Sequence, residues 1–364
     1  RRVDAAPLDA RAQLLLGHWL YAHARRSEAI EHWTAAATLS LDAVAERNLG
    51  LAAFNVSSDP VAARVHYEAA LRIAPDDARL LFEHDQLLSR IGVQPTTRLA
   101  RLEASRVSID QGDDLTIRYA NLLIDVGRID EAKLVMSGRP LQPCEGGEGQ
   151  ALATWDRLSL VEASLALERG ETPRAIEALR GAIAPPESLG EARYPLANDS
   201  ALRLALGDAL AAGGDEAEAR EQWRRAATFV GDFRSMTVEP FSEMTFHSIL
   251  AWRRLGDDAR ANELSAGLET YLNDLRKAVP EVDYFATSLP GLLLFADDLI
   301  TRRDRLVALL SAQLAVLKND EESARMLLDT LLDADPGHPV ARDLVRTLDT
   351  VRFTFREDLD HVTD

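Results

Sequence analysis

The stretch LGLAAFNVSSDPVAARVHYEAALRIAP, residues 49–75, decides the fold. Gly50 is a small residue within a first apolar pattern of helical spacing, and Ala63 and Tyr67 belong to a second such pattern. A small residue lets two helices approach closely, and a large residue four positions later fills the groove between them. Pro75 then ends the second helix. The stretch therefore predicts a pair of antiparallel helices.

The same pattern recurs along the chain. The small residue of the second helix stands at Ala29 and Ala63, 34 residues apart, and another 34 residues lead to Thr97 in a degenerate unit. In later units it stands at Ala132, Ala175, Ala219, Ala261 and Ala324. Five positions earlier comes a turn residue, where tolerance of positive φ ends the first helix. These turn residues are Gly127, Gly170, Gly214, Gly256 and Asn319.

Repetition of a helix pair at this period predicts an all-α solenoid. The small-large-small pattern resembles the tetratricopeptide repeat family, with eight units, one of them degenerate, readable over most of the chain. The resemblance implies a superhelix of antiparallel helix pairs.

The spacing between repeats then lengthens from 34 or 35 residues to 42 or more. The turn inside each pair keeps its length, so most of the extra residues fall between successive pairs. They form four long segments: GRPLQPCEGGEG, APPESLGEARYPLAND, GDFRSMTVEPFSEM and AVPEVDYFATSLPG. Because equivalent junctions of a solenoid stack along one edge, we expect the four loops to form one continuous rim. Insertions gathered on one face commonly mark a binding face.

This organisation predicts regular repeats over residues 1–140, repeats with long loops over 141–300, a C-terminal repeat over 301–350 and an acidic tail over 351–364. The chain has no initiator Met, and Pro7 fits the end of a preceding unit. We therefore expect that the front of a longer protein is missing.

The charge and the motifs exclude several classes of function. A net charge of −18 repels phosphate backbones and anionic lipids, which argues against nucleic-acid and membrane-surface binding. A single cysteine, Cys144, excludes an internal disulfide and favours a cytoplasmic location. Histidines at metal-binding spacing and a phosphate-binding glycine loop are both missing from the sequence. We expect neither a metal nor a cofactor.

The loops combine carboxylates with aromatic rings, which suits a sugar. Carboxylates accept hydrogen bonds from hydroxyl groups, a ring can lie against a pyranose, and two suitably spaced carboxylates can act as general acid and base. The alternative is ordinary polar loop chemistry with solvated acids. The candidate ligand-binding residues are Glu145, Glu148, Glu191, Glu239, Glu243 and Tyr284.

The loops also resemble a narrower group. The segments CEGGEG, ESLGEA, PFSEMTF and DYFATSLPGLLLFADDL are similar to those in the C-terminal repeat half of large bacterial proteins. The N-terminal half of those proteins is a galactose-mutarotase-like β-sandwich, a domain of unknown function. Family members usually carry Trp where this chain has Cys144. The resemblance implies a carbohydrate-related protein whose repeats flank the sandwich, without an established reaction.

Three functions follow as hypotheses. The first is a non-catalytic scaffold that binds another protein, or its own N-terminal domain, through the acidic rim. In the second, the rim completes a sugar-binding or glycoside-processing site shared with that domain. The third is a free-standing peptide-binding repeat protein that uses its concave groove. We expect no catalysis by this chain on its own and assign no catalytic residue.

Overall fold

The computed structural model of the protein describes residues 9–142, 148–229, 231–234, 237–280, 294–296 and 298–360. The chain forms two compact units. Unit 1 comprises residues 1–119 and 290–297, and unit 2 comprises residues 120–289 and 298–364. Each unit is described separately below.

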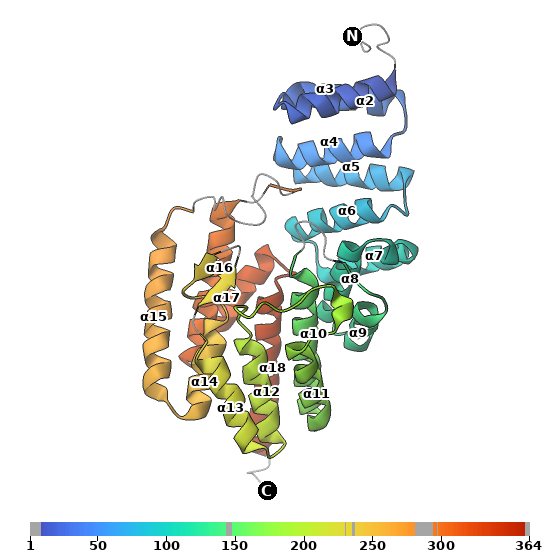
Figure 1. The fold of residues 1–364 in the computed structure, drawn as a ribbon. Helices are drawn as coiled ribbons and strands as arrows, with labels where there is room; N and C mark the ends of the chain where they lie inside the picture. Colours follow the sequence, from blue (N-terminus) through green and yellow to red (C-terminus); the bar gives the residue numbers. More distant parts are fainter. Residues whose placement is uncertain are drawn as a thin grey trace. The chain divides into compact units, whose positions relative to one another are not determined.

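Unit 1 is built from antiparallel helix pairs (Figure 1). In chain order its helices are α2 (Ala10–Ala22), α3 (Arg26–Leu39), α4 (Ala43–Asn55), α5 (Pro60–Ile73), α6 (Ala78–Arg90), α7 (Pro95–Ala104), the 3-10 helix η1 (Arg106–Gln111) and the first part of α8 (Asp113–Asp125). An aspartate side chain caps four of these helices by accepting a main-chain N–H of the first turn, which satisfies a donor that the helix cannot. The caps are Asp9, Asp42, Asp59 and Asp77.

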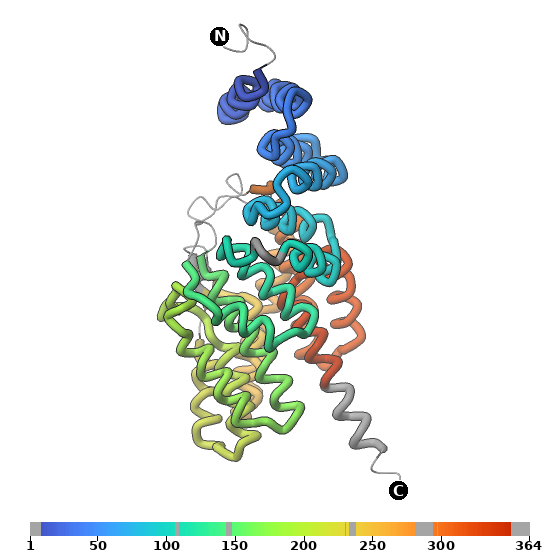
Figure 2. The backbone as a smooth tube through the Cα atoms, turned by 90° about the vertical axis from the view of Figure 1, so that its right-hand side faces the viewer, coloured from blue at the N-terminus to red at the C-terminus, as the bar shows by residue number. Residues whose placement is uncertain are grey.

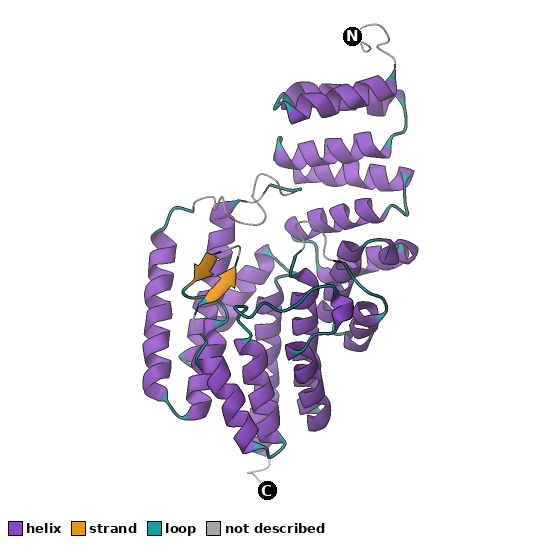
Figure 3. Cartoon of the chain, viewed as in Figure 1, coloured by secondary structure: helices purple, strands orange, loops and turns teal. Residues whose placement is uncertain are grey.

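Unit 2 begins with the end of α8 and is also mostly helical. Its other helices are α9 (Ile129–Ser137), α10 (Gln150–Glu168), α11 (Thr172–Ile183), the 3-10 helix η2 (Glu187–Leu189), α12 (Ser200–Ala212), α13 (Glu216–Ala227), α14 (Thr245–Leu255), α15 (Asp258–Lys277), α16 (Leu299–Leu317), α17 (Glu321–Ala334) and α18 (Pro339–Asp360). A short antiparallel hairpin, β1 (Asp232–Arg234) and β2 (Thr237–Glu239), lies in the loop before α14 (Figure 3).

The packing within the pairs follows the sequence pattern. Gly50 of α4 faces Tyr67 of α5, where a Cβ would lie 2.7 Å from the Tyr67 ring, and Gly207 of α12 faces Trp223 of α13 in the same way. The small residues of the second helices are all completely buried, namely Ala29, Ala63, Ala132, Ala175, Ala219, Ala261 and Ala324. The predicted all-α helical repeat fold of tetratricopeptide type is therefore confirmed.

The predicted turn residues all have positive φ, from 58° at Asn319 to 86° at Gly214. In the first two pairs Ala24 (φ 59°) and Ser58 (φ 52°) occupy the same position, five residues before the buried alanine. The sequence pattern missed these two because neither residue type signals a left-handed conformation.

The prediction for the degenerate unit was wrong by one residue. Thr97 is exposed, and the buried position of α7 is Arg98, whose guanidinium pairs with buried Asp85 at 2.6 Å. In the other pairs the buried residue lies four positions after the N-cap, and Arg98 keeps this distance from its N-cap Gln94. The turn at Gly92 is one residue longer than the others, which shifts the register.

At the C-terminus, α18 continues through residues that the sequence assigned to an acidic tail, up to residue 360. The division of the sequence at residues 140, 300 and 350 separates segments of different loop length and stays a prediction.

Candidate functional site

Unit 1 holds a short segment of its own chain against α4, α5 and α6. The described part is Leu294, Phe295 and Ala296, which lies beside these helices in both views (orange in Figures 1 and 2). This segment lies within residues 290–297, which belong to unit 1, whereas residues 120–289 and 298–364 belong to unit 2.

Asn55, the last residue of α4, binds the main chain on both sides of Phe295. Its Nδ2 donates to the carbonyl oxygen of Leu294 at 2.9 Å, and its Oδ1 accepts from the amide of Ala296 at 2.8 Å. A side-chain amide carries both a donor and an acceptor, so one asparagine can satisfy both groups. Arg90 of α6 adds a bond from Nη1 to the carbonyl oxygen of Ala296 at 3.3 Å.

The side chain of Phe295 fills an apolar pocket and is only 1% exposed. Its ring meets the edge of Phe54, with ring centroids 5.1 Å apart, and is tilted against Tyr67 at 5.9 Å. Such tilted and edge-on contacts between aromatic rings add to the free energy gained by burying apolar area. Ala53, Ala63 and Leu87 complete the cluster around the ring.

Polar groups behind Tyr67 hold the pocket in place. The Tyr67 hydroxyl donates to Glu83 at 3.0 Å, and the buried Glu83 carboxylate also accepts from Arg47 at 2.7 Å and from Arg79 at 2.9 Å. Burial raises the pKa of Tyr67 and lowers the pKa of His84, which stacks on Tyr67, to about 4. Both rings are therefore neutral at physiological pH. The pocket offers an apolar surface to a side chain, and Asn55 and Arg90 bind the main chain beside it.

In unit 2, three of the four predicted loops are joined in order. The first loop connects α9 to α10, the second connects α11 to α12, and the third connects α13 to α14. Leu141 of the first loop donates its amide to the carbonyl oxygen of Ser188 in the second loop at 2.7 Å. Asn198 of the second loop donates to the carbonyl oxygen of Gly231 in the third at 3.0 Å. These three loops therefore form a connected rim, whereas most of the fourth loop, residues 281–293, lies outside the described residues.

Glu191 of the second loop acts as a capping group. Its two carboxylate oxygens accept the amides of Gly149 at 2.6 Å and Leu152 at 3.0 Å, so a residue of the second loop caps the start of α10. Glu148 is exposed beside this helix start. Glu145 lies outside the described residues.

The remaining candidates are spread along the third loop. The Tyr271 hydroxyl lies 3.4 Å from Glu239 Oε2, and the main-chain carbonyl of Glu243 accepts a bond from Gln313 at 3.1 Å. Tyr284 lies outside the described residues. The ligand-binding role of the six candidates stays a prediction.

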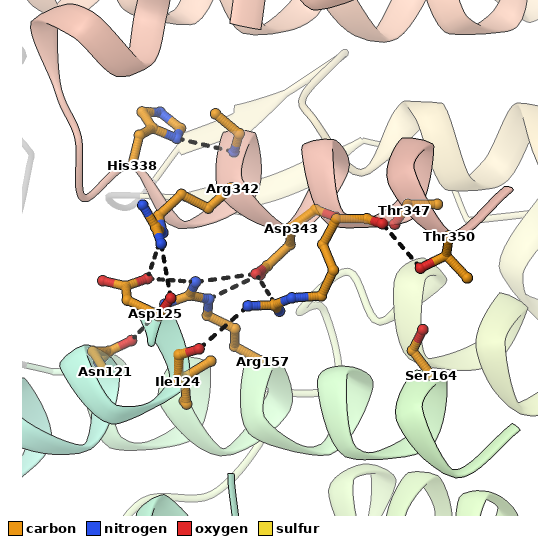
Figure 4. A network of polar contacts seen from close by, with 12 residues as sticks. Asn121, Ile124, Asp125, Arg157, Ser164, His338, Arg342, Asp343, Thr347 and Thr350 are labelled. Carbon is orange, nitrogen blue, oxygen red and sulfur yellow. Dashed lines mark hydrogen bonds and ion pairs between the residues drawn. The ribbon is translucent and has the colours of Figure 1, made fainter. Parts of the chain in front are cut away.

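The C-terminal helix α18 binds the first elements of unit 2 (Figure 4). Arg157 of α10, which is 8% exposed, lies between Asp125 of α8 at 2.8 Å and Asp343 of α18 at 2.8 Å. Arg342 of α18 donates to the main-chain carbonyl of Asp125 at 2.7 Å, at the C-terminal end of α8 where a cation is favourable. These contacts join α18 to α8 and α10.

Sequence reasoning identified neither Asn55 nor Arg157 as a binding residue. Asn55 stands in an ordinary helix end, and its partners lie 239 residues or more away. The only available signal for Phe295 was that the most apolar run of the chain is cut short by aspartates before α16.

The described residues offer neither a metal site nor a membrane-spanning helix. There, no cluster of three or more His, Cys, Asp or Glu side chains could hold a metal ion. In that same part of the chain, no helix is long and apolar enough to cross a bilayer.

No family model matches the chain. Among solved structures the chain is similar to MamA, with 16% identity and a TM-score of 0.37 over 50% of this chain and 89% of MamA. It is similar to PilW, described as a widely conserved type IV pilus biogenesis factor, with 13% identity and a TM-score of 0.39 over 63% and 92%. Yeast Tom70 matches with 12% identity and a TM-score of 0.33 over 97% and 96%.

Proposed function

We propose that the chain is a non-catalytic helical-repeat scaffold that binds protein partners, with unit 1 as its segment-binding part. The observation that carries this proposal is the pair of hydrogen bonds from Asn55 to the main-chain groups flanking Phe295. A side chain that binds the peptide groups themselves recognises a polypeptide, and the adjoining pocket accepts one side chain of it. This combination suits a protein segment better than a small metabolite.

The groups around the pocket also favour binding over catalysis. A general acid or base must offer a proton position to the substrate at an appropriate pKa. Glu83 is instead buried, and its oxygens already accept bonds from Tyr67, Arg47 and Arg79. His84 is neutral because burial lowers its pKa to about 4.

The test vacates the pocket and offers the segment as a separate peptide. The full chain carrying Phe295→Ala is titrated calorimetrically with a peptide of the sequence GLLLFADDL, which matches residues 291–299. We expect saturable binding with one site per chain. Adding Asn55→Ala to the same chain removes two hydrogen bonds and should weaken binding at least tenfold, because each bond contributes about 1 kcal/mol.

A matched control replaces Asn262, an exposed asparagine of α15 in unit 2, by alanine in the Phe295→Ala background. This change should leave the affinity unaltered. Absence of peptide binding by the Phe295→Ala chain, or equal effects of Asn55→Ala and Asn262→Ala, would refute the proposal that this site binds protein segments.

A second candidate function concerns the rim of unit 2. Tyr194 and Leu196 of the second loop are 73% and 64% exposed, and Val238 of the third loop is 64% exposed. Exposed apolar residues rimmed by acids suit a docking surface. The surface would contact the mutarotase-like sandwich half of a larger, carbohydrate-related bacterial protein, or complete a sugar site with it.

Two measurements address this candidate. Tyr194→Ala should weaken association with a separately produced sandwich half by at least tenfold if the rim is its docking surface. A shared site would be supported if the combined halves bound sugar on a glycan array and Glu148→Gln abolished this binding with an unchanged melting temperature.

The cytoplasmic location remains an expectation, and fractionation of cells that produce the protein tests it.

A further inference from the structure

We infer that residues 294–296 are a built-in competitor that occupies the unit 1 pocket until a partner segment with phenylalanine at the same place displaces it. The inference rests on the proposed function, because it assumes that the pocket binds protein segments. It adds the chemistry of the ligand and the reason why the site is closed in the free chain.

The described part of the segment is a stretch of three residues that lies outside any helix or strand. Residues 294–296 are held to unit 1 by two hydrogen bonds with Asn55, one from Arg90 and the contacts of the Phe295 ring with Phe54 and Tyr67. The helix pairs of unit 1, by contrast, bury a residue at each repeat position. A docked segment of this size opens at lower free energy than the helices beneath it, since local opening follows the number of buried contacts.

The pocket does not depend on the segment for its shape. The Tyr67 ring packs against Gly50 where α4 and α5 are in contact, and its hydroxyl donates a hydrogen bond to Glu83. Ala63 and Leu87 belong to the repeat positions of α5 and α6 and are completely buried. When Phe295 leaves, these residues keep their helical neighbours, so the pocket stays available to another ring.

The contacts specify the ligand. Asn55 needs a main-chain carbonyl before the aromatic residue and an N–H after it, at the places of Leu294 and Ala296. Proline directly after the aromatic residue would remove that N–H and is therefore excluded. The pocket itself takes a phenylalanine ring among apolar side chains. The partner is accordingly a protein segment with phenylalanine followed by a residue other than proline.

Competition within one chain sets the size of the effect. Within one chain the segment competes for the pocket at an effective concentration on the order of 1 mM. A separate segment with a dissociation constant of about 10–100 µM would then bind the unmodified chain about ten to a hundred times more weakly than a chain with an empty pocket.

The experiment compares full-length chains by fluorescence anisotropy with labelled GLLLFADDL. The Phe295→Ala chain should bind this peptide at least tenfold more tightly than the unmodified chain. The same peptide methylated on the nitrogen of its alanine, which cannot donate to Asn55, should bind the Phe295→Ala chain at least tenfold more weakly. Circular dichroism checks that the variant is folded.

A second measurement needs no variant. Hydrogen exchange of the unmodified chain is followed at the amide of Ala296, which is protected by its bond to Asn55. Saturating unlabelled peptide should accelerate exchange there at least fivefold, while an alanine-for-phenylalanine peptide should not.

The outcomes separate the two proposals. Equal affinities of the unmodified and Phe295→Ala chains, with unchanged exchange at Ala296, would overturn the competitor while Asn55-dependent binding would preserve the proposed function. Tight binding of the methylated peptide would overturn the stated ligand chemistry. Absence of binding to every chain would overturn both proposals.

Discussion

Replacing Glu191 by alanine is expected to destabilise unit 2, because this carboxylate joins the second loop to the start of α10. It accepts the amides of Gly149 and Leu152, two donors that the first turn of the helix cannot pair internally. A capping acceptor contributes about 0.5–2 kcal/mol, and a negative charge at this helix end about 0.3–1 kcal/mol. We therefore expect Glu191→Ala to lower the free energy of unfolding by about 2 kcal/mol.

Replacing Glu191 by glutamine should separate the contribution of the charge from that of the hydrogen bonds. Glu191→Gln keeps one acceptor oxygen but loses the charge and the second acceptor, so a loss of about 1 kcal/mol is expected. Urea denaturation followed by circular dichroism gives the free energies, and hydrogen exchange at Gly149 and Leu152 shows whether the start of α10 opens. Glu148→Gln is the matched control, because it removes an exposed charge near the same helix end and should cost less than about 0.5 kcal/mol.

The result also discriminates between the two roles of Glu191. The sequence predicts a ligand contact, for which replacement by glutamine abolishes binding without changing stability. If Glu191→Ala left the unfolding curve and the exchange at Leu152 unchanged, the capping bonds would contribute nothing and the reasoning above would be refuted. Equal destabilisation by Glu191→Ala and Glu148→Gln would attribute the whole effect to charge.

Three further predictions concern the framework of unit 2. Gly207→Ala places a Cβ 2.4 Å from the Trp223 ring, so the two helices must separate. Calorimetry should show that the free energy of unfolding falls by about 1–3 kcal/mol, and an unchanged melting temperature would contradict this packing. Arg157→Met removes the buried charge that pairs with Asp125 and Asp343. The free energy of unfolding in urea should fall by about 3 kcal/mol, with faster amide exchange in α18. Unaltered exchange in α18 would contradict the role of Arg157 in holding this helix. Burial raises the pKa of Asp156 from 3.8 to about 6, so its stabilising contribution is present below pH 4 and is lost as the pH rises through 6. The stability of Asp156→Asn relative to the unmodified chain should therefore rise by about 3 kcal/mol between pH 3 and pH 7, and a constant difference would show that the carboxyl titrates normally.

The repeat framework could be predicted from the sequence because its determinants are local. Gly207 and Trp223 meet because the turn between α12 and α13 has a fixed length, and the buried Ala219 follows from the same geometry. The prediction failed where one extra turn residue moved the buried position from Thr97 to Arg98. Thr97 was predicted from a constant period of 34 residues, and a constant period cannot register an insertion between the turn and the helix cap.

The rim could be predicted only as an architecture. Stacking of successive repeats brings equivalent loops together whatever their sequence, and the bonds between Leu141 and Ser188 and between Asn198 and Gly231 show that this occurs. The role of a single carboxylate within the rim depends on the path of a loop without periodicity. Glu191 reaches the start of α10 from a loop whose Ser188 also bonds to Leu141, and no spacing in the sequence indicates either contact.

The pocket of unit 1 could not be predicted for a different reason. Asn55 and Phe295 obey their local rules, the first at a helix end and the second in an apolar run, and neither residue is unusual there. What makes them a site is a contact between positions 239 residues or more apart. Local physics determines how each helix pair folds, but a short segment between α15 and α16 can dock wherever an apolar pocket and a main-chain partner coincide. The same freedom that hides this contact from sequence analysis is what would allow another protein segment to take its place.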